Sequence, residues 1–203
     1  MKWRAMGLIM LMGLFGGAPS WAAQAPQELV QQTAEQMLSK LRSERQTIDQ
    51  HPGRIYDLVN EIVLPHFDFE RMSSWVLGKY WRKATPAQRE QFEQQFRTLL
   101  VRTYAKSLSS YRDNKISYLP MRPSSQQDEV TVRTEVDQPG GFPIPIDYSL
   151  YLKGDEWKVY DVTIDGVSLV TNYRTTFANQ IRRDGLDKLI ASLADRNQQD
   201  GAK

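Results

Sequence analysis

The residues of this sequence that could perform chemistry are few, and the first candidate is a serine. In the segment DGVSLVTNYR, Ser168 stands two residues after Gly166 in an apolar setting, much as a hydrolase presents its nucleophile on a sharp turn. A nucleophile elbow has the pattern G-x-S-x-G, because the second glycine lets strand and helix approach closely around the serine. Val170 occupies the place of that second glycine. The segment therefore predicts a turn from strand to helix in which Ser168 caps the helix and does no chemistry.

Two histidines are the only imidazoles available as a base or a metal ligand. His51 stands beside a Pro-Gly break, and His66 belongs to a Pro-His-Phe-Asp turn, so neither position favours the serine–histidine pair of a triad. The chain has no cysteine, which excludes disulfides and thiolate metal sites. We interpret Asp68 as a local helix cap rather than a partner of His66 in metal binding. The sequence therefore predicts neither a metal site nor a catalytic residue here.

Acids on or beside the expected strands leave an enzymatic alternative open. A buried carboxylate in an apolar cup could act as a general base with a raised pKa, and Asp147, Asp161 and Asp165 are the candidates. The tyrosines that could assist such a base are Tyr148, Tyr151, Tyr160 and Tyr173. Strand alternation favours the simpler interpretation, in which Asp147 and Asp161 face outward. The side chains that would then face inward are Ile146, Tyr148, Tyr160 and Val162.

The N-terminus has the layout of a secretory signal peptide. Lys2 and Arg4 precede an apolar run from Met6 to Phe15, and small residues follow as far as Ala23. The run is shorter than the ~20 residues that a bilayer-spanning helix needs. We expect residues 1–22 to be removed and residues 23–203 to form a single exported domain.

Charge argues against a nucleic-acid partner. Losing Lys2 and Arg4 with the signal peptide lowers the number of basic residues from 26 to 24, which equals the 24 acidic ones. A nucleic-acid-binding domain needs a dense face of lysine and arginine. The mature chain is expected to be neutral overall and to bind no nucleic acid.

Helical periodicity dominates the first half of the chain and returns at its end. The expected helices cover residues 26–45, 55–64, 68–77, 86–111, 167–183 and 186–196. The longest begins at Pro86, because Thr85 and Gln88 form a capping box around it. This helix carries one apolar stripe: Phe92, Phe96, Leu99, Leu100 and Tyr104. Taken by itself, such a stripe is more often core than a ligand-binding wall.

Between these helical regions the apolar period changes to two from Asn114 onward. The pattern predicts four antiparallel strands, near residues 116–118, 130–136, 146–152 and 160–164, with Gly166 ending the sheet. The expected architecture is α+β, with helices laid over one face of a four-stranded meander.

Several short blocks, in their order and spacing, resemble the MlaC family, the periplasmic phospholipid-binding proteins also called toluene-tolerance proteins. The blocks are Leu64-Pro65, Phe67-Asp68, Leu77-Gly78, Trp81-Arg82, Gln88-Arg89 with Phe92 and Phe96, Trp157 to Val162, Gly166 to Val170, and Asn172-Tyr173-Arg174 with Phe177. The resemblance covers nearly the whole mature chain. It implies a cystatin-like or nuclear-transport-factor-like fold around a deep apolar cavity, which holds phospholipid acyl chains while the headgroup stays in water.

The same resemblance implies a function and partners. Proteins of this family are thought to carry phospholipid between an outer-membrane lipoprotein–porin complex and an inner-membrane ABC transporter that bears a ring of MCE domains. The expectation is therefore a periplasmic, monomeric carrier without cofactor. Two alternatives stay open: an enzyme on the same scaffold that acts on a hydrophobic small molecule, through Asp147, Asp161 or a tyrosine, and a chaperone for apolar peptide segments.

A lipid carrier needs more inward apolar surface than its own core can fill, so the resemblance makes the aromatic stripe a candidate wall. The residues expected to line the lipid cavity are Leu64, Phe67, Phe92, Phe96, Leu99, Tyr104, Val132, Tyr148, Leu150, Val162, Val167, Leu169, Tyr173 and Phe177. Within the opening segment, Val167, Leu169 and Val170 are expected to pack toward the cavity or the core.

Overall fold

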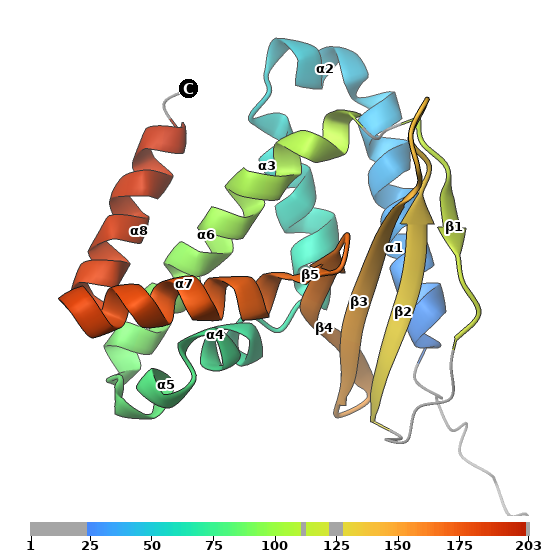
Figure 1. Cartoon of the computed structure of the whole chain (residues 1–203). Helices are drawn as coiled ribbons and strands as arrows, with labels where there is room; N and C mark the ends of the chain where they lie inside the picture. Colours follow the sequence, from blue (N-terminus) through green and yellow to red (C-terminus); the bar gives the residue numbers. More distant parts are fainter. Residues whose placement is uncertain (1–23, 111–112, 122–127, 202–203) are drawn as a thin grey trace, which may run out of the picture.

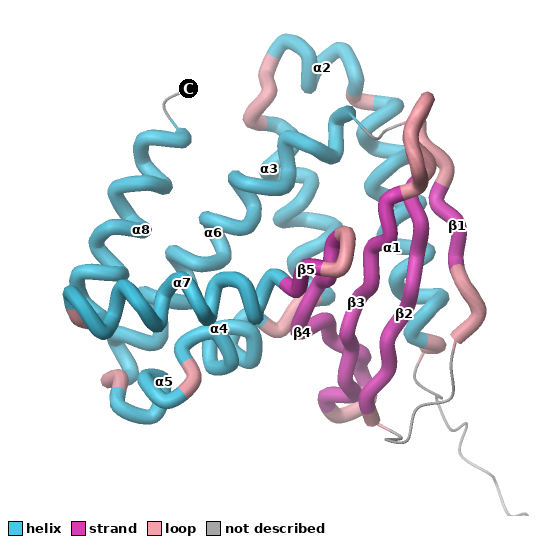
Figure 2. Tube along the Cα trace, in the orientation of Figure 1, coloured by secondary structure: helices cyan, strands magenta, loops and turns pink. Residues whose placement is uncertain are grey.

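A computed structural model describes residues 24–110, 113–121 and 128–201, and it shows helices gathered beside one antiparallel sheet (Figures 1 and 2). The segments before the sheet are α1 Pro26–Ser43, α2 Arg45–Gln50, α3 Arg54–Leu58, the π-helix η1 Val59–Val63, the 3-10 helix η2 Leu64–His66, α4 Phe69–Leu77, α5 Lys79–Lys83 and α6 Pro86–Ser110. The sheet and the closing helices are β1 Ile116–Tyr118, β2 Glu129–Val136, β3 Ile144–Lys153, β4 Glu156–Ile164, β5 Val167–Ser168, α7 Leu169–Asp184 and α8 Leu186–Gly201. The expected signal peptide lies outside the described residues.

The start of α6 follows the local sequence. The side chain of Thr85 accepts a hydrogen bond from the Gln88 amide at 3.2 Å, and the Gln88 side chain accepts one from the Thr85 amide at 3.0 Å. These reciprocal bonds satisfy two amides that have no partner within the helix. The predicted capping box is confirmed.

The helix expected over residues 55–64 is α-helical only as far as Leu58 and then widens into η1 and tightens into η2. Pro65 offers no amide donor, and in a regular α-helix its ring would clash with the carbonyl of the residue four positions earlier, so a regular helix cannot continue through this point. The prediction of a single helix was wrong in this respect. A further short helix, α5, was also not predicted.

The sheet has five strands in the order β1-β2-β3-β4-β5, all antiparallel, so the prediction of four strands was wrong. Ile164 pairs with Val167 across the two-residue turn Asp165-Gly166, whose φ angles are 49° and 77°. Positive φ at both positions is what a two-residue hairpin requires, and Asp-Gly tolerates it best. The chain therefore reverses at Gly166 to form β5, and α7 begins only at Leu169.

The short edge strand β5 also changes the surroundings of Val167. Its neighbours Leu169 and Val170 are buried as expected, but Val167 is 54% exposed. The prediction that Val167 packs inward was wrong, because the hairpin places it on an outer edge strand rather than in the first turn of α7.

A bulge between β3 and β4 redirects one tyrosine. Ser149 pairs with Asp161, yet the next residue, Leu150, pairs with Val159, so the register passes over Tyr160. The ring of Tyr160 meets that of Tyr151 edge-on, with centroids 5.9 Å apart, on the opposite side of the sheet from Tyr148. Tyr160 is half-buried against the main core, but the prediction that it shares a face with Tyr148 was wrong, because an extra residue in one strand breaks the alternation.

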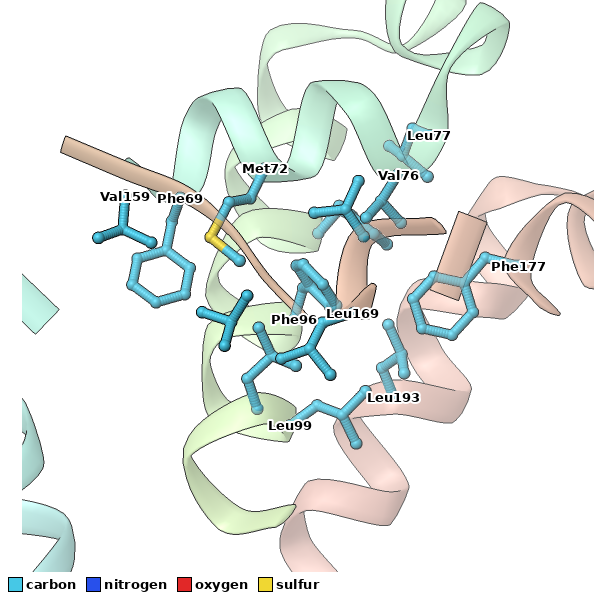
Figure 3. Packing of buried hydrophobic residues seen from close by; sticks show 14 of the residues in the cluster. Phe69, Met72, Val76, Leu77, Phe96, Leu99, Val159, Leu169, Phe177 and Leu193 are labelled. Atoms are coloured by element: carbon cyan, nitrogen blue, oxygen red, sulfur yellow. The ribbon is translucent and has the colours of Figure 1, made fainter. Parts of the chain in front are cut away.

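The main core lies between α4, α6, α7, α8 and the sheet (Figure 3). Phe92 and Phe96 are fully buried and stacked, with centroids 5.7 Å apart, and both meet Phe177 edge-on. Complete burial of such a side chain contributes about 1.5–3 kcal/mol. A second, smaller cluster joins α1, α2, α3, η1 and α6 through Leu41, Leu58 and their neighbours. No helix among the described residues is long and apolar enough to span a membrane.

Asp68 ties the helical layer to the sheet. Its carboxylate accepts hydrogen bonds from the Arg71 amide at 2.9 Å, from the Lys153 ammonium at 2.8 Å and from the Tyr151 hydroxyl. Its own amide donates to the Val159 carbonyl at 2.9 Å. The predicted helix cap is confirmed. Burial raises the pKa of Asp68, but the bonds from Lys153, Tyr151 and the Arg71 amide together outweigh burial and hold this pKa below its usual value.

Replacing this charge while keeping the cap should destabilise the protein only above acidic pH. Asp68→Asn leaves a good N-cap residue but removes the ion pair with Lys153, which is partly exposed, so we expect a loss of about 1 kcal/mol at pH 7. Because the pKa of Asp68 is depressed in the folded state, its stabilisation is complete above about pH 4 and is lost as the pH falls through the folded value. Urea unfolding at several pH values should show the two proteins converging in acid. If the difference in unfolding free energy between the two proteins stayed constant down to the lowest pH, the Asp68 charge would not have this stabilising role.

Candidate functional site

An apolar cavity of about 390 Å³ lies between α1, the sheet and the C-terminal end of α6. Helix α1 lies behind the sheet in the view of Figure 1 and contacts β2. The residues that line the cavity are Leu29, Val30, Thr33, Ala34, Met37, Leu38, Leu41, Val63, His66, Phe67, Tyr104, Ser107, Leu108, Ile116, Val136, Ile144, Ile146, Tyr148, Val159 and Ile164. Most are aliphatic, which suits a ligand with hydrocarbon chains.

Small side chains in the middle of α1 help to explain why space remains there. Leu29 and Met37 line the cavity on either side of Thr33 and Ala34 along the helix. The Thr33 hydroxyl donates to the Leu29 carbonyl at 2.8 Å, so this polar group is satisfied within the helix and does not demand water in the cavity. The short side chains of Thr33 and Ala34 therefore leave volume in the part of the cavity wall that α1 forms.

Three of the residues predicted to line the lipid cavity do line this one: Phe67, Tyr104 and Tyr148. Eight others are buried in the main core: Phe92, Phe96, Leu99, Val132, Leu150, Val162, Leu169 and Phe177. Leu64 and Tyr173 are half-buried against that core, and Val167 is exposed. The structure thus places most of the apolar stripe of α6 in packed interior, and only Tyr104 at its C-terminal end reaches the cavity.

Sequence reasoning missed the largest contributor to the lining, the helix α1. None of the residues predicted to line the cavity came from the helix expected over residues 26–45. The signal that could have identified it was the pair Thr33 and Ala34, because small residues inside an apolar stripe leave volume that a core would normally fill. Aliphatic side chains from four strands complete the wall.

The polar groups that line the cavity are neutral. Burial, with a smaller effect of Tyr118, raises the pKa of Tyr148 to about 12, and burial also raises the pKa of Tyr104. His66 is half-buried, and burial together with Lys158 lowers its pKa, so its imidazole is uncharged at pH 7. Among the described residues that line the cavity there is no carboxylate. This environment suits uncharged hydrocarbon and offers no acid–base pair poised near pH 7.

The acids of the enzymatic alternative lie elsewhere. Asp147 pairs with Thr163 on the face opposite the cavity. Asp161 is half-buried rather than turned to solvent: it accepts hydrogen bonds from the Val162 and Val170 amides at 2.8 and 3.1 Å and from the Ser168 hydroxyl at 2.5 Å. Three such bonds identify a structural carboxylate that orders the start of α7.

Ser168 is the N-cap of α7, as predicted. Its hydroxyl accepts a hydrogen bond from the Thr171 amide at 3.0 Å. The Ser168 hydroxyl contacts Asp161 and Thr171. The two histidines that could have acted as its base belong to other segments, His66 to η2 and His51 to the turn after α2. Over residues 24–110, 113–121 and 128–201, no cluster of three or more His, Asp or Glu side chains could hold a metal ion.

Several known proteins resemble this chain in sequence or in structure. The sequence profile of the family described as MlaC protein matches residues 31–195. Toluene tolerance protein ttg2D of Pseudomonas putida is 32% identical over 191 residues, which cover 93% of this chain and 88% of that protein. The intermembrane phospholipid transport system binding protein MlaC of Haemophilus influenzae is 27% identical over 195 residues. These residues cover 95% of this chain and 91% of that protein.

A solved structure with a similar fold holds a lipid. It is the phospholipid-binding protein from Ralstonia solanacearum in complex with a phospholipid, and it is 31% identical to this chain. The alignment covers 88% of this chain and 99% of that one, with a TM-score of 0.81.

Removing the Ser168 hydroxyl should cost stability and leave the cavity unchanged. Ser168→Ala deletes the cap of α7 and one partner of Asp161, so we expect a loss of about 0.5–2 kcal/mol, measured by urea unfolding. Asp161→Ala should cost more, because two buried amides lose their acceptor. Lipid content per folded protein should stay within a few-fold of wild type for both variants, as for Asp147→Ala. A variant that keeps its fold and lipid but loses a hundred-fold in membrane-to-membrane lipid transfer would instead point to a chemical step.

Proposed function

The chain belongs to the MlaC family, and on this premise we propose that it is a non-enzymatic periplasmic carrier that binds phospholipid by its acyl chains. The observation that carries the proposal is the neutral, largely aliphatic cavity between α1 and the sheet. Relatives described as phospholipid-binding and phospholipid-transport proteins support it.

A cavity of this kind removes the main barrier to moving lipid through water. At about 0.8 kcal/mol per methylene, exposing one chain of roughly sixteen carbons costs on the order of 10 kcal/mol. Moving that chain from a bilayer into an apolar cavity exchanges one hydrocarbon environment for another. Loading and unloading therefore need no chemical energy at this protein.

The proposal extends to partners and to location. We propose that the expected signal peptide of residues 1–22 directs export, and that the domain of residues 23–203 acts as a monomer in the periplasm. The donor and acceptor would be an outer-membrane lipoprotein–porin complex and an inner-membrane ABC transporter with MCE domains, in either order. Residues 23–203 contain 24 basic and 24 acidic residues, and this neutral balance is consistent with a freely diffusing shuttle.

The proposed contacts with acyl chains follow the geometry of the cavity. Phe67, Tyr104 and Tyr148 belong to both the predicted and the observed lining, and we propose that they contact lipid directly, together with Leu29, Met37 and the other α1 and strand residues named above. The buried residues of the predicted set would support this wall from behind.

Protein purified without detergent should contain about one phospholipid per chain. The headgroups should be mixed, because acyl-chain burial does not distinguish them. Organic extraction followed by mass spectrometry measures this directly. Extracts without phospholipid would count against the proposal, and a single non-lipid metabolite would favour the enzymatic alternative.

Filling the cavity from α1 should reduce the lipid content without unfolding the protein. Ala34→Trp places a large apolar side chain where acyl chains are proposed to lie. Excluding about two methylenes should weaken binding roughly tenfold. The matched control is Ala191→Trp, on an exposed position of α8. Mass spectrometry measures the lipid content of each variant, and circular dichroism shows whether each variant is folded. Equal lipid content in Ala34→Trp and Ala191→Trp would mean that the lipid binds elsewhere.

Charged substitutions at two earlier candidates are informative for a different reason. Phe96 is fully buried in the core, so a charge there should unfold the protein rather than empty the cavity. Val167→Asp, at an exposed position, should change neither stability nor lipid content appreciably.

A further inference from the structure

A cationic group lies beside one of the polar residues that line the apolar cavity. His66 lines the cavity, and the Lys158 ammonium donates a hydrogen bond to the carbonyl of Pro65, the preceding residue, at 3.1 Å. The ammonium is thus held next to His66, close enough for its charge to lower the pKa of that imidazole. The two side chains thus place two nitrogen donors beside the hydrocarbon lining.

Backbone contacts fix this pair in place. Phe67 and Val159 form a parallel bridge, and the Asp68 amide donates to the Val159 carbonyl at 2.9 Å. These contacts hold the turn around His66 against the edge of β4. Lys158, one residue before Val159, therefore reaches across the strand edge to the turn, while Val159 itself lines the cavity.

His66 lines the cavity and is half-buried, and the Lys158 side chain beside it is partly open to solvent. The Lys158 side chain is 22% exposed, and its ion-pair partner Glu156, at 2.7 Å, is 72% exposed. A carboxylate so exposed can turn into water at little cost, because surface ion pairs contribute about 0–1 kcal/mol. An anion at the rim could therefore replace Glu156 as the partner of Lys158.

We propose that His66 and Lys158 bind the phosphate of a phospholipid whose acyl chains occupy the cavity. This inference rests on the proposed function. A lysine ammonium binds phosphate as a point charge, and a neutral imidazole contributes one N–H donor. Phosphate is common to all phospholipids, so the pair would retain phospholipids as a class and still accept mixed headgroups.

The segment before β1 is the natural comparison. There Lys115 precedes the cavity-lining Ile116, as Lys158 precedes Val159. No histidine stands beside Ile116 in the sequence. Lys115 is therefore a matched control for a lysine beside a lining residue.

A competition between two lipids with identical chains tests the assignment. Each protein is incubated with vesicles that contain equal amounts of a phosphatidylethanolamine and the diacylglycerol with the same acyl chains, and the bound lipids are quantified by mass spectrometry. The ratio of phospholipid to diacylglycerol should fall about tenfold in the double variant His66→Leu, Lys158→Met, because a partly exposed charge-assisted contact is lost. It should rise in Glu156→Gln, which removes the competing carboxylate, and stay unchanged in Lys115→Met.

The outcomes separate this inference from the function on which it rests. The phosphate site would be overturned if the double variant kept a normal total lipid content and the same ratio of phospholipid to diacylglycerol as wild type. That result would leave the carrier proposal intact. Wild-type protein that binds neither lipid would overturn both. Inorganic phosphate added to the assay should leave the ratio unchanged, since the acyl chains hold the headgroup in place; loss of the preference would assign the pair to the free ion instead.

Discussion

The packing of Phe92, Phe96 and Phe177 is the constraint on which the rest of the structure depends. These rings join α6 to α7 in an interior that is filled without help from a ligand. A protein that keeps an apolar cavity gives up dispersion contacts along its wall, so stability has to come from elsewhere. Here the packed half of α6 supplies it, and the other end of the same helix, with Tyr104 and Leu108, is free to face the cavity.

Irregular backbone builds the end of the cavity where the proposed phosphate site lies. The chain passes from α-helix to π-helix to 3-10 helix before Phe67, and it is then held to β4 through Asp68. A straight helix through this region would carry its side chains around all faces in turn. The broken one directs Val63, His66 and Phe67 toward the same space, while Asp68 turns away to Lys153 and Tyr151.

A neutral, aliphatic lining also explains how binding and release can both be easy. Burial of hydrocarbon is non-directional, so a chain can slide along such a wall without breaking specific bonds one by one. The tyrosine hydroxyls do not disturb this, because burial keeps them uncharged. Recognition of lipid as phospholipid would then fall to the rim, where a charge can meet water and phosphate together.

The sequence by itself determined the elements whose causes are local. The capping box at Thr85, the caps at Asp68 and Ser168, and the change of apolar period near Asn114 each arise from neighbouring residues, and the short motifs identified the family. The Asp165-Gly166 hairpin is equally local, although Gly166 was interpreted only as the end of the sheet. The tertiary structure decided which apolar faces meet each other and which enclose space. Phe96 and Met37 both belong to apolar helical stripes, yet one is packed in the core and the other lines the cavity. Periodicity shows only that a face avoids water; whether another side chain or a void lies opposite depends on how distant segments are placed, which no local pattern records.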